Sequence, residues 1–516
     1  MSEQVFYITT PIYYVNDVPH LGHAYTTVAA DFVARFRRMQ GRAVHLLTGT
    51  DEHGQKVLRT AEAKGLSPKE WTDQMIPRWI EVWDALRISN DDFIRTTEAR
   101  HEGPVQAFVQ ALNDRGHIYQ GTYEGLYCVG CEAFKQPEEL VDGKCPLHGI
   151  EPEVVKEENY FFKLSEFRER LIDLYENDPR FVMPEARRNE VLGKVRQGLD
   201  DLSISRISFD WGVPVPWDPA HVIYVWIDAL QNYITAVGFG RDEEMLQRIW
   251  PADVHFIGKD ILWFHSVIWP AMLMALDLPL PRTVYAHGFL QVGGEKMSKS
   301  RLTGISPHDL IGTFGADGYR YYFLREISFG QDGNFSWESM VARYNSDLAN
   351  DYGNLASRVL SMIDRYLDGL IPEPPTDAEI TDAERSLHAV YAESFAGMER
   401  GIDNLDLTGA LRSAWAFVRK ANAYVEEVTP WALAKDGSQR RRLEVVLYSL
   451  ADSLRLLALL ASPSIPDAAD RLWERLGYAD SATKHTYPED GDWGLLAPGT
   501  KVQSGDPLFP RLEETT

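Results

Sequence analysis

Two short motifs, far apart in the chain, contain residue types that suit the binding of phosphate groups. The first is PHLGH at residues 19–23, and the second is KMSKS at residues 296–300. Imidazole N–H groups donate hydrogen bonds to phosphate oxygens, and lysine ammonium groups are point charges that can follow a polyphosphate as it separates. The two motifs together predict a site that handles the phosphates of a nucleoside triphosphate.

The elements expected around the first motif place it at a helix start. Residues 5–10 are typical of a short buried strand, residues 11–18 of a loop, and residues 22–40 of a helix closed by Gly41. A helix start presents backbone N–H groups and a positive dipole end to an anion. The alternative is that the two histidines only cap or pack the helix. For the second motif the alternative is an ordinary solvated loop.

The N-terminal part of the chain has the pattern of a parallel sheet built from βαβ units. Ligands bind at the carboxyl ends of the strands in such sheets, and Asp51 and residues 19–23 fall at such ends. The pattern changes from about residue 118 and resumes at residue 222, which predicts an insertion that splits the domain. Strands or helices are expected at 5–10, 22–40, 44–50, 55–64, 69–86, 222–233, 254–258, 261–275 and 283–289.

All three cysteines lie in one window with a histidine, in the order Cys128, Cys131, Cys145 and His148. CxxC followed by CxxH is the spacing of two knuckles that present four ligands in a tetrahedron. The window therefore predicts one closed, structural Zn²⁺ site, and the alternative is a set of unrelated thiols. Disulfides are not expected, because a cytosolic protein rarely keeps them.

Beyond Ser346 the chain becomes helical. Segments 347–367, 377–400, 407–427 and 440–460 repeat apolar residues with the helical period, and residues 499–516 form an irregular tail.

The composition of the 516 residues indicates a globular protein of three or four domains, with 44% hydrophobic residues and 14 tryptophans. We expect a cytoplasmic protein that does not contact a membrane, because no signal segment or membrane-length apolar run occurs. The net charge of −24 argues against nonspecific binding of nucleic acid, although a local basic stripe can still bind RNA.

The two motifs resemble the HIGH and KMSKS motifs of class I aminoacyl-tRNA synthetases, with Leu21 in place of the commoner isoleucine. The likeness extends through TTPIYYVN at 9–16, TGTDEHG at 48–54 and FIGKD at 256–260, which are similar to the methionyl-tRNA synthetase family in particular. It covers nearly the whole chain. The resemblance implies an α/β fold with a split Rossmann-like parallel sheet, a zinc-knuckle insertion and a C-terminal all-α anticodon-binding bundle.

The expected domains follow from this resemblance. They are the first half of the catalytic domain at 1–117, the connective insertion at 118–221 with its zinc knuckle at about 124–152, the second half of the catalytic domain at 222–282, the KMSKS loop and stem-contact region at 283–345, the helical anticodon-binding domain at 346–498 and the tail at 499–516.

The resemblance implies ligation of L-methionine to tRNA(Met) through a methionyl-adenylate, with Mg²⁺ accompanying ATP. It implies catalytic roles for His20, His23, Lys296 and Lys299. The implied ATP-binding residues are His20, Gly22, His23, His287, Gly288, Met297 and Lys299. The implied methionine pocket consists of Ile12, Tyr14, Asp51, Trp226, Ala229, Leu230, Tyr233, Phe264 and His265. The implied anticodon-binding residues are Asn354, Arg358 and Trp431.

Most of these residues also have an ordinary structural interpretation. Residues 226, 229, 230 and 233 share one face of a helix and can simply pack a core. Asp51 can be the N-cap of the next helix, and Asp260 is ambiguous in the same way. Without the resemblance, Asn354 reads as an N-cap, Arg358 as a surface cation and Trp431 as a packed side chain. An aromatic pocket does suit the flexible, polarisable thioether of methionine, and Tyr14, Tyr233 or His265 can add a polar contact to its sulfur.

Three other functions compete with this interpretation. They are a class I synthetase for leucine, isoleucine, valine or cysteine, a small-molecule nucleotidylyltransferase, and a noncatalytic tRNA-binding protein derived from a synthetase. The chain lacks a large editing insertion and keeps both motifs intact, which favours the methionyl enzyme. The expected partners are ATP, L-methionine, and initiator and elongator tRNA(Met). A monomer is expected, because the chain stops before the C-terminal dimerisation module that some family members carry.

Overall fold

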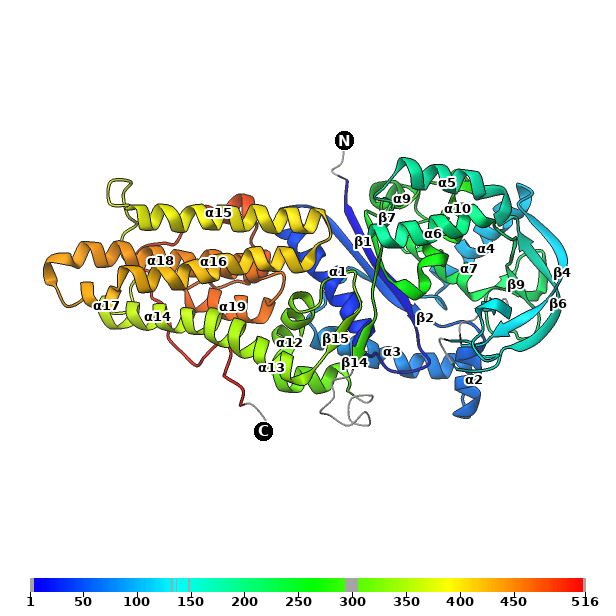
Figure 1. Ribbon diagram of the computed structural model, residues 1–516, viewed down its shortest axis with the longest axis horizontal. Coiled ribbons are helices and arrows are strands. Elements are labelled where there is room, and N and C mark those ends of the chain that lie inside the picture. Colours follow the sequence, from blue (N-terminus) through cyan, green and yellow to red (C-terminus); the bar gives the residue numbers. More distant parts are fainter. Residues whose placement is uncertain (1–3, 131–132, 136, 147–148, 293–304, 514–516) are drawn as a thin grey trace. The chain divides into compact units, whose positions relative to one another are not determined.

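The computed structural model describes residues 4–130, 133–135, 137–146, 149–292 and 305–513 (Figure 1). The chain folds into two compact units. Unit 1 comprises residues 1–19, 44–82 and 90–287, and unit 2 comprises residues 20–43, 83–89 and 288–516.

Unit 1 contains a six-stranded parallel sheet with the strand order β3-β2-β1-β12-β13-β7. Its strands are β1 (Phe6–Tyr14), β2 (Val44–Asp51), β3 (Asp92–Arg95), β7 (Val182–Met183), β12 (Val254–Gly258) and β13 (Val284–His287). Most residues of the central strands are buried, as expected for a parallel sheet that is covered on both faces. Because β1 lies between β2 and β12, segments from both sides of the insertion form one sheet. The predicted split α/β fold is confirmed.

Strand β1 continues to Tyr14, past Pro11, where the sequence predicted a loop. The register between β1 and β2 shifts between Thr9 and Ile12. On the other side of β1, its pairing with β12 reaches no further than Thr9. Proline cannot donate a hydrogen bond to a sheet, so it is tolerated at such an irregularity. The prediction of a loop was therefore wrong for residues 11–14. Ile12 and Tyr14 lie in the part of β1 that continues past its pairing with β12.

Helices flank this sheet, and two small sheets fill the insertion (Figure 1). The helices are α2 (Gln55–Ala63), α3 (Pro68–Ala85, which ends in unit 2), α4 (Ala99–Asp114), α5 (Arg168–Asn177), α6 (Glu185–Gln197), α7 (Val225–Leu230), α8 (Asn232–Thr235), α9 (Glu243–Ile249) and α10 (Trp269–Ala275). The insertion strands are β4 (Ile118–Cys128), β5 (Ala133–Lys135), β6 (Glu153–Phe162), β8 (Leu202–Ser203), β9 (Ser205–Arg206), β10 (Pro214–Val215) and β11 (Asp218–Ile223).

Unit 2 is mostly helical. Its helices are α1 (Leu21–Met39), α12 (Pro307–Arg325), α13 (Trp337–Arg343), α14 (Asn354–Leu367), α15 (Asp382–Asp403), α16 (Leu407–Val428), α17 (Pro430–Leu433), α18 (Arg440–Ala461), α19 (Pro466–Arg475) and α20 (Tyr487–Asp490). Strands β14 (Leu290–Val292) and β15 (Gly333–Phe335) pair in parallel.

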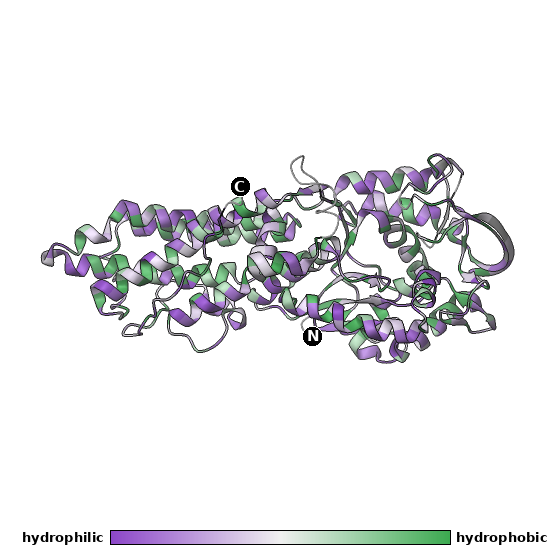
Figure 2. Ribbon diagram, turned by 90° about the horizontal axis from the view of Figure 1, so that it is seen from below, coloured by the Kyte–Doolittle hydropathy of each residue, from purple (hydrophilic) through white to green (hydrophobic). Residues whose placement is uncertain are grey.

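The four predicted C-terminal helices are present in unit 2, and α15, α16 and α18 lie side by side (Figure 1). Hydrophobic and hydrophilic residues alternate along them, as amphipathic helices require (Figure 2). The first predicted helix is divided into a π-helix, Tyr344–Gly353, and α14. The second starts later than predicted, because Thr381 and Glu384 form a capping box there. No helix in the described part of the chain is long and apolar enough to cross a membrane.

Helix α1 is held within unit 2 by a buried arginine of α12. Arg320 forms an ion pair with Asp31 of α1 at 2.7 Å, and both side chains are fully buried. The guanidinium also donates hydrogen bonds to the carbonyl oxygens of Leu86, Pro463 and Ser464. This one side chain therefore connects α1 and α12 to the turn between α18 and α19.

Candidate functional site

The first motif forms the N-terminus of α1, as predicted. His20 is the N-cap residue, and its Nδ1 accepts a hydrogen bond from the backbone N–H of Gly22 at 3.0 Å. Nδ1 of His23 accepts a longer hydrogen bond, of 3.4 Å, from the backbone N–H of His20. The two rings stack with their centroids 3.5 Å apart. Because both Nδ1 atoms are acceptors, each neutral ring carries its proton on Nε2, the atom that can donate to a phosphate oxygen.

The glycine between the histidines is required by a close approach. A Cβ on Gly22 would lie 3.0 Å from Cε1 of the His20 ring, which is closer than carbon atoms normally approach. Any larger residue would displace the His20 ring from its capping position. The capping role named above as the alternative is therefore present, and it is compatible with phosphate binding through Nε2.

The residues predicted for the other part of the ATP site lie in and around the second motif. Lys296, Met297 and Lys299 fall outside the described residues. Gly288 packs so tightly that a Cβ would lie 2.3 Å from the backbone of Gln331. His287 is the buried last residue of β13 in unit 1.

The aromatic residues predicted to bind methionine form one cluster in unit 1. The Trp226 and Phe264 rings stack in parallel, with centroids 4.0 Å apart and an interplanar angle of 8°. Tyr14 and His265 each meet Trp226 edge-on, at a centroid distance of 6.4 Å. These residues come from β1, α7 and the segment before α10. Trp226, Phe264 and Tyr14 stay partly exposed, so the cluster offers aromatic surface that a ligand can contact.

The backbone at this cluster differs from the prediction in two places. The expected single helix through residues 226–233 is broken after Leu230, and Tyr233 belongs to the next short helix, α8. Ala229, Leu230 and Tyr233 are buried against the core, whereas Ile12 is partly exposed. Phe264 and His265 begin a π-helix, Phe264–Ile268, in the middle of the expected helix 261–275. Single π-turns of this kind are frequent at functional sites.

Two carboxylates lie near the ends of β2 and β12, the two strands that flank β1 in unit 1. Asp51 is the last residue of β2 and is 3% exposed. The N-cap of the following helix is Gly54, so the interpretation of Asp51 as a helix cap is wrong. Asp260 lies in a 3₁₀ turn whose N-cap is Gly258, so it caps no helix either. Burial raises the pKa of Asp260 above its usual value.

Half of the predicted zinc ligands lie in the described chain. Cys128 ends β4, and Cys145 begins a tight turn in which its N–H donates to the carbonyl of Ile150. Both thiols are fully buried. Cys131 and His148 lie outside the described residues, and the described residues alone contain no group of three or more side chains that could hold a metal ion. Two buried cysteines at a strand end and a tight turn fit the donor set of a zinc knuckle.

The three predicted anticodon-binding residues come together in unit 2. Asn354 and Arg358 are one turn apart on α14. The Arg358 guanidinium lies 5.9 Å from the centroid of the Trp431 ring and also pairs with Glu426 at 2.6 Å. The interpretation of Asn354 as an N-cap is wrong, because α14 continues directly from the π-helix and its cap position is Gly353. Trp431 is only partly buried.

A buried cluster next to the methionine pocket was not foreseen. It consists of His53, His101 and Asp228, and each histidine forms a hydrogen bond with the Asp228 carboxylate. A signal was present in the sequence, because Asp228 is a lone carboxylate in the apolar stretch VWIDAL and His53 lies within the TGTDEHG segment.

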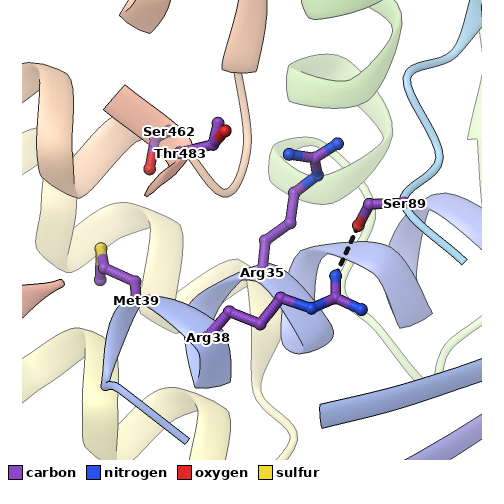
Figure 3. A pocket seen from close by; sticks show the side chains of 6 residues that line it. All are labelled: Arg35, Arg38, Met39, Ser89, Ser462 and Thr483. Carbon is purple, nitrogen blue, oxygen red and sulfur yellow. Dashed lines mark hydrogen bonds between the residues drawn. The ribbon is translucent and has the colours of Figure 1, made fainter. Parts of the chain in front are cut away.

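Unit 2 also contains a cavity of about 270 Å³ at the far end of α1 (Figure 3). Arg38 on its wall donates a hydrogen bond to Ser89 Oγ at 2.7 Å. Arg35, the lining residue nearest to His23 along α1, is 12 residues away, which is roughly 18 Å along a helix. The cavity is therefore separate from the first motif. Its lining residues are Arg35, Arg38, Met39, Ser89, Ser462 and Thr483.

Comparisons with known proteins agree on one family. A family model described as "tRNA synthetases class I (M)" matches residues 6–152 and 131–360, and one described as "Anticodon binding domain of methionyl tRNA ligase" matches residues 374–516. A methionine–tRNA ligase of Streptomyces coelicolor is 54% identical, with 99% of this chain and 97% of the relative covered. One of Caldanaerobacter subterraneus subsp. tengcongensis is 50% identical, with 99% and 79% covered.

A solved structure of Mycobacterium tuberculosis methionyl-tRNA synthetase in complex with methionyl-adenylate is 42% identical. The match covers 98% of this chain and 100% of that one, with a TM-score of 0.92. Both the sequence and the fold are therefore shared along the whole chain, and the chain belongs to the methionyl-tRNA synthetase family of class I aminoacyl-tRNA synthetases.

Proposed function

We infer that the chain activates L-methionine with ATP, forming methionyl-adenylate and pyrophosphate, and then transfers the methionyl group to the 3′ end of tRNA(Met). The observation that carries this inference is full-length membership of the methionyl-tRNA synthetase family, together with the aromatic cluster around Trp226. Stacked aromatic rings suit the polarisable thioether of methionine.

In the first step an oxygen of the methionine carboxylate attacks the α-phosphorus of ATP. A new oxygen–phosphorus bond forms, and the bond to the β-phosphate oxygen breaks to release pyrophosphate. No side chain needs to form a covalent bond, so catalysis consists of positioning and charge stabilisation. We propose that His20 and His23 donate from Nε2 to the phosphates and that Lys296 and Lys299 stabilise the leaving pyrophosphate. Mg²⁺ bound with ATP neutralises part of the phosphate charge.

We propose that Asp51 binds the ammonium group of methionine. It is a carboxylate at the carboxyl end of a central strand, the position where ligands bind in sheets of this type. The remaining proposed residues contact the side chain of methionine or the adenosine of ATP. They are Ile12, Tyr14, Trp226, Ala229, Leu230, Tyr233, Phe264 and His265 for methionine, and Gly22, His287, Gly288 and Met297 for adenosine.

In the second step a hydroxyl of the terminal adenosine of tRNA attacks the methionyl carbonyl carbon, and AMP leaves. We propose that Trp431 stacks on an anticodon base while Asn354 and Arg358 bind base edges, because sequence-specific recognition of RNA uses splayed bases in this way. The proximity of Arg358 to the Trp431 ring supports this assignment.

A structural Zn²⁺ ion held by Cys128, Cys131, Cys145 and His148 is part of the proposal. Such an ion contributes folding free energy to its knuckle and takes no part in the reaction. The bounds of the six domains, the monomeric state and the cytoplasmic location remain predictions. Sedimentation velocity measures the oligomeric state directly.

One experiment separates the candidate functions: ATP–pyrophosphate exchange measured across the amino acids, with and without tRNA. Among the amino acids, we expect only methionine to support exchange. In a second assay we expect the protein to charge tRNA(Met) with methionine. Exchange with leucine, isoleucine, valine or cysteine would assign another class I synthetase. Nucleotide transfer to another small molecule would identify the protein as a nucleotidylyltransferase. Binding of tRNA without any exchange would identify it as a noncatalytic protein.

A further inference from the structure

A fully buried carboxylate in unit 1 accepts hydrogen bonds from two histidines. Oδ2 of Asp228 lies 2.7 Å from Nδ1 of His53, and Oδ1 of Asp228 lies 2.9 Å from Nε2 of His101. The side chains of Asp228 and His101 are not exposed at all, and that of His53 is 4% exposed. Because an ionised carboxylate only accepts, both imidazole nitrogens donate to it.

The cluster connects four elements of unit 1. His53 follows β2, His101 lies on α4, and Asp228 lies on α7. Nδ1 of His101 lies 2.7 Å from Oγ1 of Thr235, which extends the network to α8. The His53 ring also meets the Trp211 ring edge-on at a centroid distance of 5.4 Å.

Each end of the central hydrogen bond adjoins a residue of the proposed methionine site. His53 follows Asp51 by two positions, and Asp228 follows Trp226 by two positions. His53 and Asp228 are 175 residues apart in the sequence. Their hydrogen bond therefore fixes the distance between Asp51 and Trp226, which no local structure sets. Asp51 would bind the ammonium group and Trp226 the side chain, and this distance must match the length of the amino acid.

A purely structural cluster would be built more simply from apolar residues. Burying a charged pair gains little stability over a well-packed hydrophobic pair, whereas the pair imposes one relative orientation on the elements that it joins. Helix α7 is apolar around Asp228, with Ile227 and Ala229 both buried. The Asp228 carboxylate therefore contributes more to the orientation of α7 relative to its neighbours than to the stability of the fold.

We propose that His53 is a positioning residue for methionine: through Asp228 it holds α7, and with it Trp226, at the correct distance from Asp51. This inference rests on the proposed function. His53 touches no reacting atom in it, and its effect reaches the substrate through the pocket helix.

The charges around His53 predict how its action depends on pH. Burial opposes the imidazolium form, but Asp228 on α7 outweighs burial, and Glu102 on α4 and Glu52 at the end of β2 act in the same direction, so the pKa of His53 is raised. Glu52 is itself paired with Arg95 of β3. Burial likewise opposes ionisation of Asp228, but His53 and His101 outweigh it and lower its pKa to about 2. The charged pair is thus complete below pH 6.5 and weakens as the pH rises through the raised pKa of His53.

The test is ATP–pyrophosphate exchange with the full-length chain carrying His53→Ala or His53→Asn. We expect His53→Ala to raise the KM for methionine roughly tenfold and to leave the KM for ATP within about twofold, because a hydrogen bond to a buried charge is lost. His53→Asn places an amide N–H near the Nδ1 position, so it should recover most of the affinity for methionine. Its KM for methionine should lack the rise with pH that we expect of the wild type above pH 6.5.

The matched control is His485→Asn, which removes a partly exposed histidine of unit 2 that pairs with Asp480 and Asp490. It should change neither KM. If His53→Ala does not fold, Glu102→Gln decides, because Glu102 is 45% exposed and lies 3.7 Å from Nε2 of His53. Removing this charge should move the rise in KM for methionine to lower pH.

Three results would overturn the proposal: an unchanged KM for methionine in His53→Ala, equal changes in both KM values, or a pH profile that Glu102→Gln does not shift. Absence of methionine-dependent exchange in the wild type would instead reject the proposed function. The ammonium group of methionine also titrates, but it does so equally in all variants, so differences between their profiles belong to the protein.

Discussion

The hydroxyl of Tyr233 donates its proton to Nε2 of His265 across 2.7 Å. The direction follows from the other side of the ring, where Nδ1 lies 3.0 Å from the carbonyl oxygen of Ile261 and must donate to it. Burial lowers the pKa of His265 to about 4, so the ring is neutral at pH 7 and its only proton is on Nδ1. In this arrangement neither side chain has a proton for the methionine sulfur. A polar contact to sulfur from Tyr233 or His265 therefore requires these protons to rearrange, whereas one from Tyr14 does not.

Acid should destabilise the protein through His265. The fold keeps this histidine neutral down to about pH 4, while the unfolded chain binds a proton near pH 6.5, so stability falls as the pH drops between these values. Between pH 7 and pH 5 the loss is about 2 kcal/mol. Urea unfolding of the wild type and of His265→Asn at both pH values measures it. The His265→Asn variant should lack this part of the loss of stability. An identical loss in the wild type and the variant would contradict its assignment to His265.

Arg320→Met should destabilise the protein by about 3–5 kcal/mol, because it leaves the buried carboxylate of Asp31 without its partner on α12. The matched control is Arg385→Met, which breaks an ion pair between two largely exposed side chains on α15 and should have no measurable effect. Urea unfolding compares the two variants with the wild type. Equal losses of unfolding free energy in both variants would mean that burial does not determine how much these ion pairs contribute to stability.

Lys299→Ala should slow adenylate formation by roughly 10²–10³-fold, because a charge that stabilises the leaving pyrophosphate is lost. Binding of methionine, measured by tryptophan fluorescence, should stay nearly unchanged. The control is Lys194→Ala, which removes a largely exposed lysine that pairs with Glu190. A normal exchange rate in the Lys299 variant would remove this lysine from the mechanism.

Trp431→Ala should raise the KM for tRNA(Met) roughly 5- to 150-fold, because stacking of one base on an aromatic ring contributes about 1–3 kcal/mol. ATP–pyrophosphate exchange should not change. The control is Glu426→Gln, which removes the ion pair of Arg358 and leaves the Trp431 ring in place. If Trp431→Ala damages both steps equally, the tryptophan has a folding role.

Purified protein should contain about one Zn²⁺ per chain, since four ligands complete a tetrahedral site. Cys128→Ser should abolish the bound zinc, measured by inductively coupled plasma mass spectrometry, and increase proteolysis within residues 124–152. Methionine activation should fall much less than in Lys299→Ala. Zinc retained at full occupancy in Cys128→Ser would refute this set of ligands.

Local patterns in the sequence predicted most elements but not their irregularities. The helix at residues 22–40 and the strand at residues 44–50 were confirmed within one residue at each end, because their apolar periods and the bounding Gly41 are local signals. The extension of β1 past Pro11 was missed because a proline normally ends a strand, and only pairing with β2 shows that a bulge accommodates it. The break between α7 and α8 was missed because an apolar period of 3.6 residues continues across it.

The sequence by itself determined the motifs to which we assign the chemistry, namely the histidines at residues 20 and 23, the KMSKS segment and the cysteine spacing, because each motif lies within one short stretch of the chain. Only the tertiary structure decided which distant residues meet. The stack of Trp226 on Phe264 and the hydrogen bond from His53 to Asp228 depend on how separate segments pack. No local period reports such contacts, because the packing of the whole unit sets them.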